Sequence, residues 1–249
     1  MRIAVLSDIH GNTCALDAVL ADLATRDINR IVNLGDCLYG PFDPMAVADR
    51  LIAEDWPTVA GNEDRILVEA ESNRSISRTA RFTFDRLAKT HSRWLSLLPG
   101  TRYLDGGPFA CHGTPTDDTR YLLSRPTANG AMRPATESEI VGRLETIDTR
   151  LVLCGHDHLP RVVRLADGRT VANPGSVGCP AYTDDNPIPH QVENGSPHAR
   201  YAIVTLCHDG SPDIELIAVP YDWNAAAFEA EANGFPDWAS WLRTGRTRG

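Results

Sequence analysis

The chain has 249 residues, of which 42% are hydrophobic and 23% charged, the composition of an ordinary globular protein with a sizeable core. Its net charge of −9 argues against extended nucleic acid as a partner, because DNA and RNA binding needs clustered Lys and Arg. No apolar run approaches the roughly 20 residues of a membrane span, and the N-terminus lacks signal-peptide features. We therefore expect a cytoplasmic protein without a membrane partner, and the oligomeric state stays open.

The first 60 residues alternate between short apolar runs and helical stripes. The predicted strands are Arg2–Leu6, Arg30–Leu34 and Thr58–Ala60, and the predicted helices are Asn12–Arg26 and a segment that begins at Pro44 and includes Ile52. This βαβαβ order favours a parallel or mixed sheet that is covered by helices.

In the rest of the chain, a predicted helical region is followed by a region of predicted strands. Residues Asn62–Leu98 are predicted to be mostly helical with a break at Ser72–Ser77, and Gly100–His112 to form a hairpin around Asp105-Gly106-Gly107. Further predicted elements are the strands Leu151–Leu153, Arg161–Leu165, Thr170–Ala172, Tyr201–Leu206 and Ile214–Val219, turns at Asp167-Gly168 and Asp209-Gly210, and a helical segment Trp223–Trp241. The polar segment Pro180–Pro197 is predicted to be a surface loop at the mouth of the site. Two β-rich layers flanked by helices, within one domain over residues 1–249, are the simplest architecture.

Residues of the kinds that bind metal ions stand where several apolar runs end. These candidates are Asp8, His10, Asp36, Asn62, His112, His156 and His158. Asp8 and His10 are two residues apart, as are His156 and His158, and in an extended segment residues at this spacing point the same way. Cys111 and Cys154 each precede a candidate, so we expect them to face the opposite side and pack in the core.

These oxygen and imidazole ligands, without thiolate, suit Mn, Fe, Zn or Ni. Two such ions close together can activate water and hold both oxygens of a phosphoryl displacement. A single strand-end Asp is often a turn former, and a single His is more often a surface or core residue. The complete set is what favours a metal centre.

The blocks D-x-H, G-D, G-N-x-D, H-G and G-H-x-H resemble those of the calcineurin-like metallophosphoesterase superfamily, and look closest to its small bacterial phosphodiesterase-like branch. The resemblance implies a four-layer α/β/β/α sandwich with two mixed sheets and two divalent ions at the edge between them. It implies one ion held by Asp8, His10, Asp36 and His158, and another held by Asp36, Asn62, His112 and His156. Asp36 would bridge the ions, and a bridging hydroxide would be the nucleophile.

Glu63 stands where the family most often has a His that is assigned to leaving-group protonation or phosphoryl binding. Two divalent ions, two carboxylates and a hydroxide leave one net positive charge, which an ionised Glu63 would cancel. That should weaken attraction for a dianionic monoester more than for a monoanionic diester. We therefore expect a catalytic-site role for Glu63 and a preference for phosphodiester or nucleotide phosphoanhydride bonds. Alternatively, Glu63 points away and stabilises the start of the following helix, or acts as a protonated general acid.

Two further residues are candidates for substrate binding. Asn12 either caps the first helix or reaches the substrate, and Arg65 either contacts a phosphate or lies on the surface. A small phosphoester or nucleotide is the expected substrate. The rival functions are a phosphomonoesterase, acting on proteins or small molecules, and a non-catalytic scaffold, since a retromer subunit resembles this fold.

Overall fold

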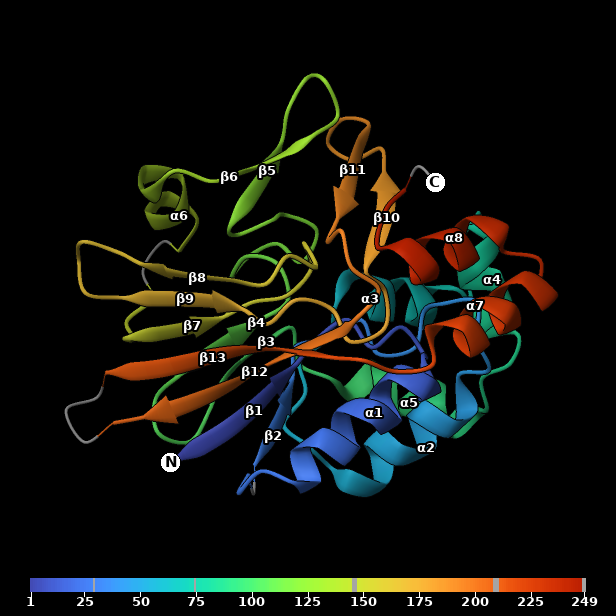
Figure 1. Ribbon diagram of the computed structural model, residues 1–249, viewed down its shortest axis with the longest axis horizontal. Helices are drawn as coiled ribbons and strands as arrows, with labels where there is room; N and C mark the ends of the chain where they lie inside the picture. Colours follow the sequence, from blue (N-terminus) through green and yellow to red (C-terminus); the bar gives the residue numbers. More distant parts are fainter. Residues whose placement is uncertain (29, 74, 145–146, 208–210, 248–249) are drawn as a thin grey trace.

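The computed structural model describes residues 1–249 except 29, 74, 145–146, 208–210 and 248–249, and contains two large mixed β-sheets with helices around them (Figure 1). The first sheet has the strand order β13-β12-β1-β2. Its strands are β1 (Arg2–Leu6), β2 (Ile31–Asn33), β12 (Ala199–Leu206) and β13 (Pro212–Val219). The pair β1 and β2 is parallel, whereas β12 is antiparallel to both of its neighbours.

The second sheet has the strand order β3-β4-β7-β9-β8. Its strands are β3 (Thr101–Tyr103), β4 (Phe109–Cys111), β7 (Leu151–Leu153), β8 (Arg161–Arg164) and β9 (Thr170–Asn173). The central strands β4, β7 and β9 run parallel, and the two outer strands are antiparallel to them.

The helices fall into an N-terminal group, one short helix on the second sheet and a C-terminal pair. They are α1 (Thr13–Ala24), α2 (Met45–Glu54), α3 (Asn62–Glu69), α4 (Arg78–Phe84), α5 (Lys89–Leu97), α6 (Glu137–Leu144), α7 (Trp223–Ala232) and α8 (Pro236–Thr244). Figure 1 shows α1, α2 and α5 together on one side of the first sheet, with α6 beyond the second sheet. None of the helices that the structure describes has the length and apolar character needed to cross a membrane.

The alternation of side chains along each strand decides which layers pack together. In β1, Ile3 and Val5 belong to a cluster between the two sheets, whereas Ala4 and Leu6 pack with residues of α1 and α2. On the second sheet, Cys111 and Cys154 pack on the other face with Ile140 of α6, as the sequence predicted. Apolar clusters therefore fill the space outside the first sheet, between the sheets, and outside the second sheet.

The expected α/β class with two mixed sheets is confirmed, two local expectations are changed, and two elements were not predicted. The segment Pro180–Pro197 is not a loop: it contains the antiparallel hairpin β10 (Ala181–Asp184) and β11 (His190–Glu193). Its Asn186, Pro187 and Pro189 lie in the connecting turn, so the strands themselves keep their hydrogen bonds.

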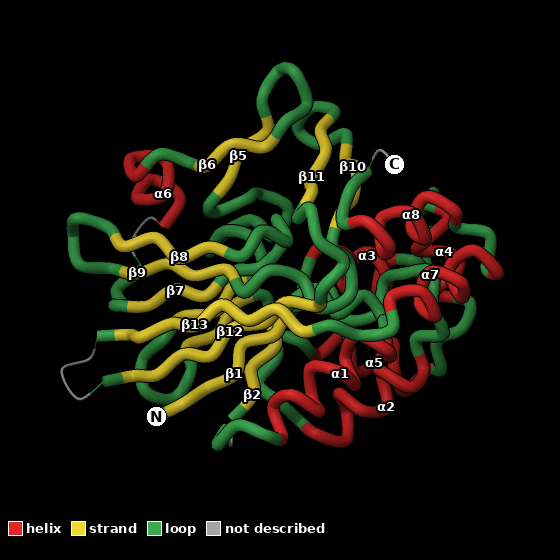
Figure 2. Tube along the Cα trace, viewed as in Figure 1, coloured by secondary structure: helices red, strands yellow, loops and turns green. Residues whose placement is uncertain are grey.

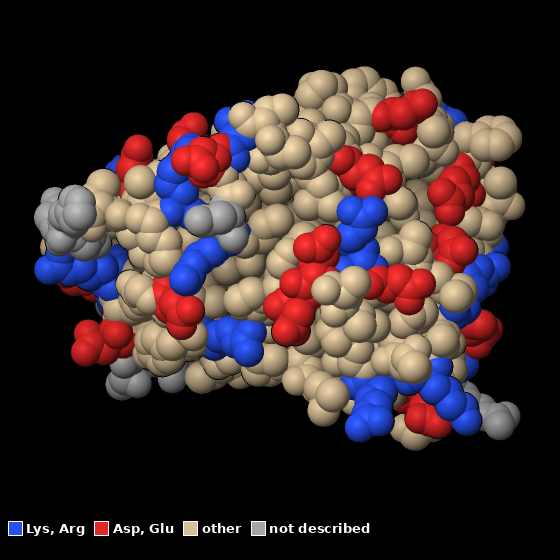
Figure 3. Space-filling model, turned by 90° about the horizontal axis from the view of Figure 1, so that it is seen from below, with Lys and Arg blue, Asp and Glu red and all other residues tan. Residues whose placement is uncertain are grey.

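The predicted strand Thr58–Ala60 is reduced to a single bridge between Asn33 and Thr58. A second small hairpin, β5 (Ser124–Pro126) with β6 (Met132–Pro134), was not predicted, and neither was α6. The predicted Asp209-Gly210 turn lies outside the described residues. On the face shown in Figure 3, the described acidic and basic side chains are interspersed, without a broad cationic patch.

Candidate metal centre

The strands β1, β2, β4 and β7 lead at their carboxyl ends into loops that carry candidate ligands, and Figure 2 shows loops gathered between the sheets and the helices. Backbone hydrogen bonds join two of these loops: Asp8 donates to Gly35 O at 2.9 Å, and His10 donates to Asp36 O at 3.0 Å. Residues that follow different strands are thereby brought to one place.

Most of the candidate ligands have a left-handed backbone. Their φ angles are 55° at Asp8, 53° at His10, 52° at Asp36, 69° at His156 and 53° at His158. Among the non-glycine residues that the structure describes, only Asp55, at the end of α2, shares this conformation. A non-glycine residue held there costs roughly 1–3 kcal/mol, so a cluster of them marks a functional site. The pairs Asp8–His10 and His156–His158 thus converge through tight turns, and not through the extended geometry that their spacing suggested.

One group of ligand atoms surrounds Asp8. His158 Nε2 lies 3.1 Å from Asp8 Oδ1, and His10 Nε2 lies 3.2 Å from His158 Nε2. One ligand atom each from Asp8, His10 and Asp36 lie within 4.8 Å of one another. Four predicted ligands therefore meet here.

A second group surrounds His112. His112 Nε2 lies 3.1 Å from Asp36 Oδ2 and 3.1 Å from Asn62 Oδ1. Ligand atoms of Asp36, His112 and His156 lie within 4.8 Å of one another. Asp36 belongs to both groups, which places all seven predicted ligands in one cluster.

Backbone carbonyls orient the four imidazoles. The pairs are His10 Nδ1 with Tyr39 O at 2.8 Å, His112 Nδ1 with Leu34 O at 2.8 Å, His158 Nδ1 with Cys179 O at 2.7 Å, and His156 Nε2 with Thr119 O at 2.9 Å. A carbonyl only accepts, so the ring nitrogen that faces it carries the proton. In the neutral ring, the other nitrogen then presents its lone pair to the cluster, which is the arrangement of metal-binding histidines.

Asp64 holds the loop that carries Asp36, a role that the sequence analysis missed. Its buried carboxylate accepts hydrogen bonds from the backbone N–H groups of Asp36 at 2.9 Å, Cys37 at 2.9 Å and Gly61 at 3.0 Å. Gly61 approaches so closely that a Cβ there would overlap Asp36 Oδ1. The only available signal was the acidic position in the first turn of α3.

The carboxylates and imidazoles of the cluster shift one another's pKa values. Burial by itself would lower the pKa of His10 and of His112, but neighbouring carboxylates, chiefly Glu63 and Asp36 respectively, raise these pKa values to about 9 and about 10. Burial and the nearby His112 lower the pKa of His156 to about 4. Burial opposes ionisation of Asp8, yet His158 and its neighbours hold the pKa of that carboxyl below its usual range.

Asp8 Oδ1 is fully buried without a hydrogen-bond partner. When the His158 proton is on Nδ1, the lone pair of His158 Nε2 faces a lone pair of Asp8 Oδ1 at 3.1 Å. A cation between these two atoms would remove their repulsion. The donor set therefore fits divalent cations.

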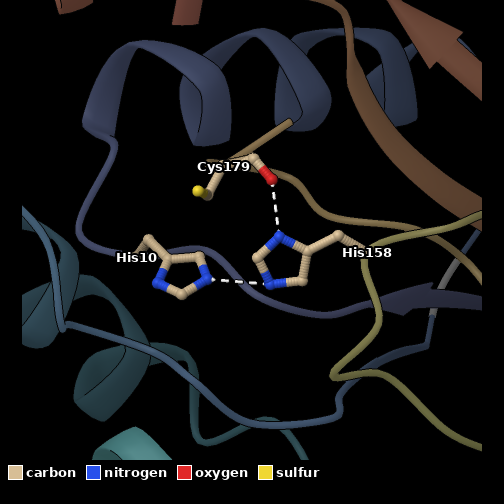
Figure 4. Close-up of side chains that lie close together, drawn as sticks. All are labelled: His10, His158 and Cys179. Atoms are coloured by element: carbon tan, nitrogen blue, oxygen red, sulfur yellow. Dashed lines mark hydrogen bonds between the residues drawn. The ribbon is translucent and has the colours of Figure 1, made fainter. Parts of the chain in front are cut away.

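The Cys179 thiol does not complete a further site with His10 and His158, although these three groups lie close together (Figure 4). His158 Nδ1 is already engaged by Cys179 O, and the thiol donates to Ala181 O at 3.2 Å. Cys179 is thus a wall of the cavity that orients His158 through its backbone.

Glu63 points into the site. Its Oε2 lies 3.2 Å from His10 Nδ1, and its backbone N–H donates to Asp36 Oδ1 at 2.9 Å. Burial and the Asp36 carboxylate raise the pKa of Glu63 to about 8 in the metal-free protein, and the hydrogen bond with His10 opposes this rise. The alternative in which this side chain points away from the site is therefore not what the structure shows.

A cavity of about 490 Å³ opens over the cluster. Its floor contains His10, Asp36, Asn62, His156 and His158, and Glu63 lines the same space. Its outer wall comes from α8, the β10–β11 hairpin and the segment between α3 and α4. A small organic molecule fits a space of this size.

The two predicted substrate-binding residues make other contacts in the structure. Asn12 caps α1 by accepting a hydrogen bond from Ala15 N at 3.0 Å, and its amide donates to Gly178 O at 3.1 Å. The guanidinium of Arg65 pairs with both oxygens of Asp118 at 2.8 Å and 2.9 Å. Neither side chain lines the cavity over the cluster.

Comparison with known proteins agrees with this geometry. The "Calcineurin-like phosphoesterase superfamily domain" matches residues 1–192. The uncharacterized protein MJ0912 of Methanocaldococcus jannaschii is 24% identical over 252 residues, covering 95% of this chain and 94% of that protein.

Two solved structures extend the likeness over nearly the whole chain. A metallophosphoesterase from Sphaerobacter thermophilus is 25% identical with a TM-score of 0.76, covering 98% of this chain and 100% of that one. Hypothetical protein PH1004 from Pyrococcus horikoshii OT3 is 18% identical with a TM-score of 0.73, covering 98% of both chains, and shares the fold. Because the family match spans most of the 249 residues, the protein belongs to the calcineurin-like phosphoesterase superfamily.

Proposed function

We propose that this chain is a dinuclear metal-dependent phosphoesterase that hydrolyses phosphodiester or nucleotide phosphoanhydride bonds in preference to phosphomonoesters. The observation that carries the proposal is the pair of ligand groups that share Asp36 at the floor of one cavity. Membership of a superfamily of phosphoester hydrolases that use divalent metals supports it.

We propose the division of ligands that the resemblance implies. Asp8, His10, Asp36 and His158 would hold one ion, and Asp36, Asn62, His112 and His156 would hold the other. When bound, two divalent ions supply an activated water and offset the negative charge of the phosphoryl group. The chain itself fixes the ligands through the carbonyls and the Asp64 carboxylate described above, so little reorganisation accompanies binding.

Glu63 supports the preference for diesters. Bound cations favour an ionised carboxylate at this position, and Glu63 lines the cavity beside His10. A second negative charge on a monoester would be repelled by Glu63 more than the single charge of a diester.

The first test measures metal content and substrate preference together. Metal-stripped protein reloaded with Mn²⁺ should contain two ions per chain by elemental analysis. It should hydrolyse bis(4-nitrophenyl) phosphate faster than 4-nitrophenyl phosphate. A protein that binds no metal and hydrolyses neither ester would contradict the proposal and favour the scaffold function.

The second test changes Glu63 alone. Glu63→Gln should shift the diester-to-monoester ratio toward the monoester by about tenfold, because one nearby negative charge is removed. Glu54→Gln removes the same charge from an exposed position on α2 and should leave the ratio unchanged. An unchanged ratio in both Glu63→Gln and Glu63→His would show that Glu63 does not set the preference.

A further inference from the structure

We propose that the cavity over the metal centre selects phosphodiesters whose second substituent is an alcohol bearing a quaternary ammonium or amine. This inference rests on the proposed phosphodiesterase function and names the substrate class for that site. It comes from the cavity wall beside the ligands, which is aromatic and acidic.

Helix α8 supplies the aromatic part of the wall. The rings of Trp238 and Trp241 lie 5.7 Å apart at an angle of 41°, and both side chains line the cavity. Trp238 also contacts the His10 ring, with a centroid separation of 5.7 Å, so this wall begins directly beside the metal ligands. Tyr182 packs in the same apolar cluster and lines the cavity too. Indole and phenol faces attract organic cations.

The hairpin β10–β11 adds negative charge to this wall. Tyr182 and Asp184 are two residues apart on β10, so their side chains leave the same face of the strand, and both line the cavity. No ion pair among the described residues involves Asp184, whose carboxylate accepts a hydrogen bond only from the neighbouring Asn186 N–H at 3.0 Å. Glu69 also lines the cavity, but it pairs with Arg65 at 3.4 Å, so Asp184 is the stronger source of negative charge.

The charge of the described lining narrows the substrate class. None of the described residues that line the cavity is Lys or Arg, whereas Glu69 and Asp184 lie outside the metal ligands. The extra phosphates of a nucleotide anhydride would therefore meet carboxylates, which repel them. A diester with one phosphate and a cationic substituent places its single negative charge at the metals and its positive charge against the indoles and Asp184.

A matched pair of chromogenic diesters isolates the positive charge. In 4-nitrophenyl phosphocholine the substituent ends in a trimethylammonium group, and in 4-nitrophenyl 3,3-dimethylbutyl phosphate a tert-butyl group of nearly the same shape replaces it. In both reactions a water oxygen bonds to phosphorus, the bond to 4-nitrophenolate breaks, and a proton is released. We expect kcat/KM of the Mn²⁺-loaded protein to be about tenfold higher for the choline ester.

Two substitutions test whether the aromatic and acidic wall causes the difference in kcat/KM between the two diesters. Asp184→Asn keeps the shape and the hydrogen bond to Asn186, and Trp241→Leu removes an indole face while keeping an apolar side chain. Each should reduce the choline-to-dimethylbutyl ratio severalfold. Asp185→Asn removes the same charge from the next, exposed residue and should leave the ratio as in the wild type.

The outcomes separate the two proposals. A ratio near one in the wild type, with both diesters hydrolysed, would overturn the cation site and leave the phosphodiesterase proposal standing. A raised ratio that Asp184→Asn and Trp241→Leu do not change would also overturn it. Hydrolysis of neither diester, with metal bound, would overturn the phosphodiesterase proposal itself.

Discussion

The body of a strand such as β1 and the loop at its carboxyl end differ in polarity and in backbone conformation. In β1, residues Ile3 to Leu6 are extended, apolar and buried, with alternate side chains packed on two different cores. Two residues later, Asp8 is equally buried but charged, left-handed in its backbone and without a hydrogen-bond partner for one oxygen. The same change occurs after β2, at Asp36.

This difference shows where stability and function reside. The strand bodies satisfy every local preference and supply the free energy of folding. The loops place ligand side chains close together against backbone strain of roughly 1–3 kcal/mol per residue, which the rigid sheets must support. Substitutions in the two regions should therefore have separable effects.

Substitution of Asp36, the ligand shared by both groups, is the strongest test of whether stability and function reside in different regions. Asp36→Asn should lower diester hydrolysis by about three orders of magnitude, because one carboxylate serves both ligand groups. The metal-free variant should be only modestly less stable than the wild type in urea unfolding, since the Asp36 carboxylate pairs with His112 and its pKa is lowered in the folded state. A large loss of stability would mean that the cluster contributes to folding.

The complementary test changes a residue in the body of a strand, where we expect stability and not activity to fall. Ile203→Ala in β12 should lower the free energy of unfolding by about 2–5 kcal/mol, because this fully buried side chain packs between the first sheet and its helices. Activity per folded molecule, measured well below the unfolding transition, should stay within about twofold of the wild type. A specific loss of activity would show that the two regions are coupled.

A substitution at Gly61, whose backbone lies against the Asp36 side chain, should have a smaller effect on the metal centre. Gly61→Ala should weaken Mn²⁺ affinity by about 10-fold to 100-fold, because the added Cβ displaces the Asp36 carboxylate. Isothermal titration of the metal-free protein measures this. Gly142→Ala in α6, where an added Cβ meets no atom, is the matched control and should bind Mn²⁺ normally. Equal affinity in both variants would refute the role of Gly61.

The pH dependence of stability distinguishes the metal-free from the metal-bound site. The pKa values of His10 and His112 are raised in the folded state to about 9 and about 10, from 6.5. Their contribution is therefore complete below pH 6.5 and is lost as the pH rises through 9 and 10. Between pH 7 and 9 we expect metal-free protein to lose on the order of 2 kcal/mol of unfolding free energy for each of these two histidines. Protein with Mn²⁺ in excess should not show this fall, since bound cations replace those protons; the same slope in both forms would argue against binding at these histidines.

The smallest expected effect concerns Asn12. Asn12→Ala should lower the free energy of unfolding by about 1 kcal/mol through loss of the α1 cap, and Asn12→Ser should retain most of that stability. The KM for a diester should change little in either variant. A rise in KM without loss of stability would instead support the substrate contact that the sequence left open.

Much of the fold follows from local patterns. The predicted β1 has the observed bounds, and the helical stripe within Asn12–Arg26 and the break at Ser72–Ser77 appear as expected. The hairpin β10–β11 was missed because its proline and asparagine residues dominate the segment although they occupy only the turn. Helix α6 was missed because it is short and covers the second sheet only through a few apolar residues.

In the candidate site too, some features follow from the local sequence and others depend on tertiary packing. The seven ligand types were visible because strand-end motifs are local, and the charge of Glu63 was visible for the same reason. Its direction was not, since the position of a helix start relative to His10 depends on how α3 packs. The same holds for Asp64, whose carboxylate binds three backbone groups from two separate loops.

The sequence by itself determined the alternation of apolar residues, and hence the sheets, and the chemical identity of the metal ligands, because both are properties of neighbouring residues. The tertiary structure alone decided which nitrogen of each histidine faces the cluster and that Asp64 holds the loop that carries Asp36. It also decided that the tryptophans of α8 and Asp184 of the β10–β11 hairpin line the same cavity as the ligands. These features depend on contacts between residues as far apart in the chain as His10 and Trp238, whose distance no local pattern encodes.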